Sequence, residues 1–259
     1  MGPGKELGPI KQSKYFNYID QMEEARLAWP QIKRLHQQDE DVARNIQRST
    51  DSSERKRLRK IRLRILGSVL EAERKSLGPN HPRVAESLLT RGLVHVQLGH
   101  ASASVGGHGS YADGLEEIRN AVHIYRGSLG DKHPDVAQAV AKLAQVYQKR
   151  NSSERTVSEG GKSIIRYDPD RALGLYQLSI KVLRASIDNG SSGTNERAAE
   201  IAFLLDCIGT IHQNKRNFPE AIEAYSSASA ALGGRNRQVR MRQQGASRSV
   251  IMDDGGDTH

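Results

Sequence analysis

Few residues of this 259-residue chain have the type and spacing that chemistry requires. His81 and His133 each stand directly before a proline, with no second histidine four residues away and no cysteine nearby, so we interpret them as residues of helix corners rather than metal ligands. Cys207 lies in an apolar run and is expected to be buried and unreactive. The segment Gly160 to Ser163 lacks the earlier glycine of a phosphate-binding loop. We therefore predict no catalytic site, no cofactor and no metal.

The composition favours a thin helical core. Only 36% of the residues are hydrophobic and 5% aromatic, whereas 27% are charged. The apolar residues recur at helical spacing, and strand-like alternation over more than four residues is hard to find, so we expect an all-α fold. Without a disulfide, a signal peptide or an apolar run of about 18 residues, we expect a cytoplasmic protein with no membrane segment, the nucleus being the alternative compartment.

The net charge of +9 is concentrated in two segments. Residues 55–64 contain seven cations and no anion, and the stretch from Arg235 to Arg248 adds five arginines. The first segment has three interpretations: a solvated helix face, a nuclear-localisation or nucleic-acid patch, and a contact for an acidic protein or membrane surface. The cations of this predicted basic patch are Arg55, Lys56, Arg57, Arg59, Lys60, Arg62 and Arg64.

The strongest pattern in the sequence is a repeated block of nine residues. Leu77 to Ala85 (LGPNHPRVA) returns 52 residues later as Leu129 to Ala137 (LGDKHPDVA). Glycine can adopt the left-handed conformation that ends a helix, and a proline four residues later fits the first turn of the next helix. Each block is therefore predicted to form a tight corner between two helices, as in proteins built from stacked helical units.

The expected helices divide the chain into four parts. Pro30 is predicted to break or bend the first helical segment, giving two shorter helices or one bent helix. Loop insertions are expected at about 99–110 and 150–168. The predicted parts are a disordered tail at 1–14, N-terminal helices with a degenerate repeat at 15–77, a repeat array at 78–232 and a disordered Arg-rich tail at 233–259.

The last predicted helix pair carries small residues at diagnostic positions. Gly209 and Ala221 are twelve residues apart, and Ala228 follows seven residues later. This spacing resembles the tetratricopeptide repeat (TPR), in which two helices cross at small residues. The repeated corner is similar to that of kinesin light chains and their relatives. From about Leu66 to Leu232 the chain is thus identified as a TPR-like repeat protein of the kinesin-light-chain-like type. The resemblance implies antiparallel helix pairs stacked as a short right-handed superhelical solenoid.

The resemblance also implies a function. Proteins of this family hold extended peptides or partner helices on the inner face of their first helices, so we expect a non-catalytic protein-interaction scaffold or adaptor. The alternative is a nucleic-acid-associated helical-repeat protein that uses residues 55–64 and the Arg-rich tail. Carried over by position, the expected partner-binding residues are Leu89, Leu93, Val96, Lys142, Gln145, Lys149, Asp206, Thr210, Gln213 and Asn214, and Gln138 and Phe203 belong to the same face.

Overall fold

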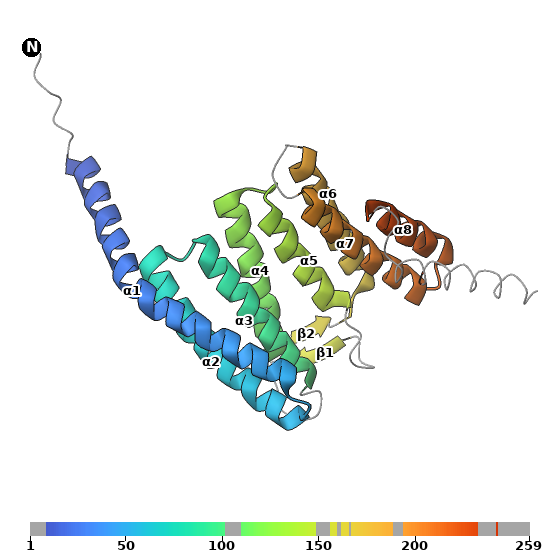
Figure 1. Ribbon diagram of the computed structural model, residues 1–259, viewed down its shortest axis with the longest axis horizontal. Coiled ribbons are helices and arrows are strands. Elements are labelled where there is room, and N and C mark those ends of the chain that lie inside the picture. The colour runs from blue at the N-terminus through green and yellow to red at the C-terminus, as the bar shows by residue number, and fades with distance from the viewer. Residues whose placement is uncertain are drawn as a thin grey trace, which may run out of the picture. The chain divides into compact units, whose positions relative to one another are not determined.

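The computed structural model describes residues 9–101, 110–148, 156–159, 162–165, 167–188, 194–232 and 242 (Figure 1). The chain divides into two compact units, Met1–Ser128 and Leu129–His259, which we describe one at a time. No helix within the described ranges is long and apolar enough to cross a membrane.

The first unit is built from helices joined in hairpins. Helix α1 packs along α2, and α2 also packs against α3 (Figure 1). The core between them includes Ile32 of α1 and Leu66, Val69 and Leu70 of α2, all of which are buried and the last three of which recur at helical spacing. The helices of this unit are α1 (Pro9–Arg48), α2 (Ser52–Leu77), α3 (Pro82–Ala101) and α4 (Ser110–Leu129).

Pro30 does not interrupt the first helix. Of the two outcomes that the sequence predicts, two shorter helices or one bent helix, the structure contains the second: α1 runs as a single helix from Pro9 to Arg48, and its axis changes direction along its length (Figure 1). Pro30 is exposed, and inside a helix it removes one backbone hydrogen bond. The helix also begins within the segment predicted to be a disordered tail, of which residues 1–8 lie outside the described part of the chain.

Both repeated corners contain the conformations that their sequences predict. Gly78 has a φ angle of +85° and Gly130 one of +86°, values that residues other than glycine rarely adopt. Pro82 begins α3 and Pro134 begins α5 (Pro134–Gln148). The glycine that ends one helix and the proline that begins the next are therefore used in the same way in each copy.

The corner histidines have a structural role. The backbone N–H of Arg83 donates to Nδ1 of His81 over 3.2 Å, and the backbone N–H of Asp135 donates to Nδ1 of His133 over 3.2 Å. Each imidazole thus accepts a hydrogen bond from one of the first N–H groups of a helix, which have no partner within the helix itself. This geometry confirms the interpretation of both histidines as corner residues.

Helices α3 and α4 approach closely at two glycines. A Cβ atom at Gly92 would lie 2.8 Å from the carbonyl oxygen of Gly114, and a Cβ atom at Gly114 would lie 2.6 Å from the carbonyl oxygen of Gly92. Both distances are shorter than non-bonded carbon and oxygen atoms allow. The small residues predicted at this crossing are therefore required by the packing.

The second unit is also built from paired helices that cross at a small residue. Helix α5 packs against α6, α6 against α7, and α7 against α8. At the α7–α8 crossing, a Cβ atom at Gly209 would lie 2.6 Å from Cε1 of the buried Tyr225. The remaining elements of this unit are β1 (Thr156–Glu159), β2 (Lys162–Ile165), α6 (Pro169–Asp188), α7 (Thr194–Asn214) and α8 (Phe218–Ala231).

One insertion contains regular structure that the sequence does not predict. Strand β1 pairs antiparallel with β2, from Thr156 opposite Ile165 to Glu159 opposite Lys162. Strands of four residues are too short to show the alternation by which strands are recognised. The 150–168 insertion is therefore not a plain loop, and most of the 99–110 insertion lies outside the described residues. Apart from this hairpin, the regular structure of the described residues is helical and is built from paired helices.

Candidate functional site

In the second unit, α5 and α7 bring predicted partner-binding residues close together. The side-chain amide of Gln148 on α5 donates to the backbone carbonyl of Cys207 on α7 over 3.4 Å. One end of this contact region has a second link, because Gln138 on α5 forms a hydrogen bond with Glu200 on α7. Between these links lies Lys142, which is exposed. We call the surface formed by Gln138, Lys142 and Gln145 of α5 and by Phe203, Asp206, Thr210, Gln213 and Asn214 of α7 the α5–α7 face.

The electrostatics of this face follow from partial burial. Burial raises the pKa of Glu200, while the hydrogen bond with Gln138 and the charge of Lys142 act in the opposite direction. Burial also raises the pKa of the Cys207 thiol to about 11, so the thiol stays protonated at neutral pH. The expectation that Cys207 is buried is confirmed.

The polar residues of α7 are held by hydrogen bonds. The hydroxyl of Tyr225 on α8 donates to Oε1 of Gln213 over 2.9 Å, and the hydroxyl of Thr210 donates to the backbone carbonyl of Asp206 over 2.9 Å. The Gln213 amide nitrogen stays available as a donor, and Asn214 is exposed. The side chains of Thr210 and Gln213 are therefore oriented before any partner arrives.

The carboxylate of Asp206 has a partner that the sequence does not predict. Its Oδ2 atom forms an ion pair with Nη1 of Arg242, a residue of the predicted Arg-rich tail. Its Oδ1 atom is buried and has no hydrogen-bond partner among the described atoms. A predicted partner-binding position of α7 is thus occupied by an arginine of the same chain.

Phe203 is the most exposed large hydrophobic residue of the described chain. Its exposed fraction is 51%, and it precedes Asp206 by nearly one helical turn, on the α5–α7 face. Exposing an aromatic ring of this size to water is unfavourable unless a partner covers it. Single exposed apolar residues are common, so the exposure of Phe203 alone does not indicate a binding site. The indication comes from Phe203 together with the polar residues of the same face.

In the first unit, the predicted residues on α3 divide by burial. Leu89 and Leu93 are half-buried. Val96, however, is only 2% exposed, and a Cβ atom at Gly114 would lie 2.9 Å from its Cγ2 atom. Val96 therefore packs between α3 and α4 and does not lie on an open face, because it is four residues after Gly92, on the side of α3 that crosses α4. Lys149 lies outside the described part of the chain.

The predicted basic patch on α2 is also divided. Arg62 forms two hydrogen bonds with the carboxylate of Asp39 on α1, from Nε over 2.8 Å and from Nη2 over 3.0 Å, so it joins two helices and is not a free surface cation. Arg57, Lys60 and Arg64 are exposed. None of these three has an ion pair with another described residue.

The other cations of the patch are less accessible. Arg55, Lys56 and Arg59 are half-buried, and the Nε atoms of Arg55 and Arg59 have no hydrogen-bond partner among the described residues. Burial and the nearby charge of Arg55 lower the pKa of Arg59. The three exposed cations therefore form the accessible part of the patch, which we call the α2 basic face (Arg57, Lys60, Arg64).

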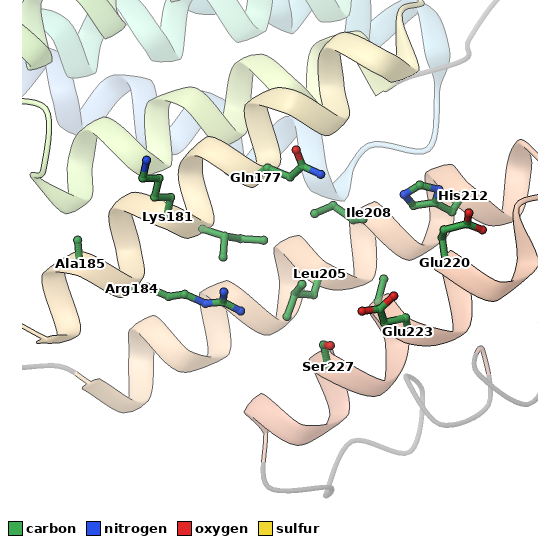
Figure 2. Close-up of a pocket in the computed structure, with 12 residues that line it drawn as sticks. Gln177, Lys181, Arg184, Ala185, Leu205, Ile208, His212, Glu220, Glu223 and Ser227 are labelled. Carbon is green, nitrogen blue, oxygen red and sulfur yellow. The ribbon is translucent and has the colours of Figure 1, made fainter.

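A groove on the second unit was not predicted from the sequence. It has a volume of about 700 Å³ and is bordered by α6, α7 and α8 (Figure 2). Its residues recur at helical spacing on each helix, which is the only signal in the sequence that could have indicated it, and core-facing residues share that spacing. The groove is lined by Gln177, Ile180, Lys181, Arg184, Ala185, Leu205, Ile208, His212, Glu220, Glu223, Ala224 and Ser227.

Solved structures similar to this chain contain TPR-like repeats. One comprises the nearly identical TPR-like repeats of a Podosopora anserina protein assigned as a kinesin light chain; it is 14% identical, covers 85% of this chain and 97% of its own, and has a TM-score of 0.45. A variant of the same repeats with one Gln-to-Met substitution is 17% identical, covers 84% and 98%, and has a TM-score of 0.45. No protein-family model and no curated protein sequence matches the chain.

Proposed function

We propose that this chain is a non-catalytic scaffold or adaptor that holds a peptide or a partner helix on the α5–α7 face. Stacked helical repeats typically make extended binding surfaces rather than catalytic pockets. The observation that carries the proposal is Phe203, an aromatic ring that is 51% exposed on a face whose other side chains are polar. Aromatic residues surrounded by polar ones are typical of the centres of protein interfaces.

The rigidity of this face supports the proposal. The hydroxyl of Tyr176 on α6 donates to Oε1 of Gln148 over 2.5 Å, and the amide nitrogen of Gln148 donates to the carbonyl of Cys207 on α7. These bonds connect α5, α6 and α7 beneath the face. A surface that is ordered before binding loses less conformational entropy when a partner is bound.

The polar groups indicate what kind of peptide would bind. Lys142 can donate charge-assisted hydrogen bonds to a carboxylate, and the amides of Gln145 and Asn214 can pair with a peptide backbone or with amide side chains. We therefore propose an acidic or amide-rich ligand segment with an apolar residue for the Phe203 ring.

Affinity capture from a native lysate tests this function. Wild-type chain, treated with nuclease and washed with salt, is compared with a Lys142→Glu, Asn214→Ala variant and with a Lys132→Glu control. Lys132 is also an exposed cation of the second unit, but it lies in the corner before α5. Proteins kept by the wild type and the control, and lost by the double variant, support the proposal. Equal retention by all three chains contradicts it.

The α2 basic face supports a second candidate function, association with nucleic acid. Arg57, Lys60 and Arg64 follow at helical spacing, so they point to one side of α2, and all three are exposed. Contacts of lysine and arginine with phosphates release counterions, so such binding weakens steeply as salt increases. Reversing the charge of all three residues should abolish salt-sensitive binding of single-stranded RNA or duplex DNA. Unchanged binding would show that the α2 basic face is not a nucleic-acid binding site.

A further inference from the structure

We propose that the groove bordered by α6, α7 and α8 is a second docking surface, which takes an amphipathic helix with acidic residues along one side of its apolar stripe and basic residues along the other. The groove differs from the α5–α7 face because it uses other residues of α7. Leu205 and Ile208 line the groove, whereas Phe203 and Asp206 belong to the α5–α7 face. The inference is therefore independent of the proposed function.

The floor of the groove is apolar. Ile180 of α6 and Ile208 of α7 are buried beneath it, with exposed fractions of 6% and 7%, and Leu205 of α7 is half-buried. Ala185 and Ala224 add short side chains on either side and so leave room for larger ones from a partner. An apolar stripe placed here would be removed from water, which is the main favourable term in protein association.

The two walls of the groove carry opposite charges. Lys181 and Arg184 lie on the α6 side, and Glu220 and Glu223 lie on the α8 side. Figure 2 shows Arg184 extending from α6 toward Leu205, with Glu223 across the groove on α8. All four side chains belong to exposed residues, and none of them forms an ion pair with another described residue. The charges on both walls are therefore available to a partner.

A helix satisfies this arrangement better than an extended strand. Within each wall the two charged residues are three positions apart, which is slightly less than one helical turn. Each wall therefore presents a short row of like charges that runs parallel to the axis of its helix. A partner helix with apolar residues at every third or fourth position has an apolar stripe along its length. The residues on the two sides of this stripe form two rows with the same spacing as the charges of the walls. Acidic residues in the row beside α6 and basic residues in the row beside α8 would pair with both walls, and such complementarity selects partners.

The test uses three stapled helical peptides of about 15 residues that share one leucine stripe. The first has one acidic and one basic flank, the second has only basic flanks and the third only acidic flanks. A helix can lie in the groove in either direction, so exchanging the flanks of the first peptide would only reverse it, and the uniform peptides are the proper controls. Fluorescence polarisation with the full chain should show at least about tenfold tighter binding of the mixed peptide.

Charge reversal of one wall should change this preference. The variant Lys181→Glu, Arg184→Glu has two acidic walls and should prefer the basic peptide, and Glu220→Lys, Glu223→Lys has two basic walls and should prefer the acidic peptide. These residues are exposed, so the helices should stay folded, as circular dichroism would verify. Glu220→Gln, Glu223→Gln removes one wall's charge without adding another and should weaken the mixed peptide. Phe203→Ala should leave all groove binding unchanged.

Four results would overturn the proposal. The first is a mixed peptide that binds wild type no more tightly than the uniform peptides do. The second is a preference that both charge-reversed variants keep. The third is a dimer of the full chain, measured by light scattering, that the same reversals dissociate, because the occupant would then be a second copy. The fourth is peptide binding that Phe203→Ala abolishes, because the peptide would then lie on the α5–α7 face and not in the groove.

Discussion

His36 on α1 and Glu73 on α2 form an ion pair across the first helix hairpin, with 3.0 Å between Nε2 and Oε1. Glu73 is only 1% exposed, and its second carboxylate oxygen has no hydrogen-bond partner among the described atoms. A buried carboxylate with one contact is costly without a charged partner. The protonation of His36 therefore bears on how firmly α1 packs against α2.

This ion pair predicts that the first unit loses stability as pH rises. The hydrogen bond with Glu73 raises the pKa of His36 above its ordinary value of 6.5, with a further contribution from Glu86, although burial and Arg83 act in the opposite direction. Because the folded pKa is the higher one, the contribution is complete below about pH 6.5 and is lost as pH rises through the folded value. Urea unfolding between pH 5.5 and 8.5 should show this loss in wild type.

One histidine variant tests this prediction and a second serves as its control. His36→Gln should remove the pH-dependent part of the unfolding free energy, whereas His123→Gln, at an exposed histidine of α4, should leave it in place. Parallel pH profiles for wild type and His36→Gln would show that the ion pair does not contribute.

Arg62 and Arg64 should differ in their contribution to stability although they are only two residues apart. The Arg62 guanidinium holds the carboxylate of Asp39, which is buried, with an exposed fraction of 7%. Arg62→Ala should therefore reduce the unfolding free energy by about 1–3 kcal/mol, since it leaves a buried charged acceptor without a partner. Arg64→Ala, at an exposed position, should change it by less than about 0.5 kcal/mol. Urea unfolding of both variants checks this, and equal values would refute it.

Two glycines of α4 should respond in opposite ways to the same substitution. Gly114→Ala would place a methyl group 2.6 Å from the carbonyl of Gly92, so the helices must separate, and we expect a loss of about 1–3 kcal/mol. Gly127→Ala meets no atom within 4 Å and should gain about 0.5–1 kcal/mol from the lower conformational entropy of the unfolded chain. Thermal melts followed by circular dichroism distinguish the two, and a stabilising Gly114→Ala would disprove the close crossing.

Arg242 should reduce access to the α5–α7 face. Its guanidinium is paired with Asp206, one of the predicted partner-binding residues. Arg242→Ala should therefore increase the amount of partner recovered in the affinity capture described above, while Arg235→Ala serves as a control from the same tail. A decrease in recovery with Arg242→Ala would indicate that this arginine contacts the partner directly.

The sequence predicted the parts of the fold that depend on local backbone chemistry. Gly78 and Gly130 occupy left-handed conformations, and Gly209 lies against Tyr225 at a helix crossing, because only a residue without a side chain fits these positions. Pro30 left two outcomes open, a break or a bend, because a proline removes one helical hydrogen bond without deciding whether the neighbouring turns stay together. Helix α1 is continuous and packs along α2, and packing of this kind cannot be read from a local pattern.

The candidate site was predicted less completely than the fold. Lys142 and Asp206 do lie on neighbouring helices, but helical spacing could not show that Val96 is buried against α4 or that Arg62 is paired with Asp39. Both facts depend on contacts between helices far apart in the sequence. The groove of Arg184 and Glu223 was missed for the same reason, because its walls come from two helices that are not consecutive.

Site-specific photo-crosslinking tests the central claim most directly. A benzoylphenylalanine replaces Phe203 in one chain and Leu178 in another; Leu178 is a comparable exposed hydrophobic residue, 43% exposed, on α6. After irradiation in a native lysate, crosslinked proteins are identified by mass spectrometry. We expect a discrete partner at position 203 that is absent at position 178 and is reduced by Lys142→Glu. The same products at both positions, or none at position 203, would contradict a partner-binding α5–α7 face.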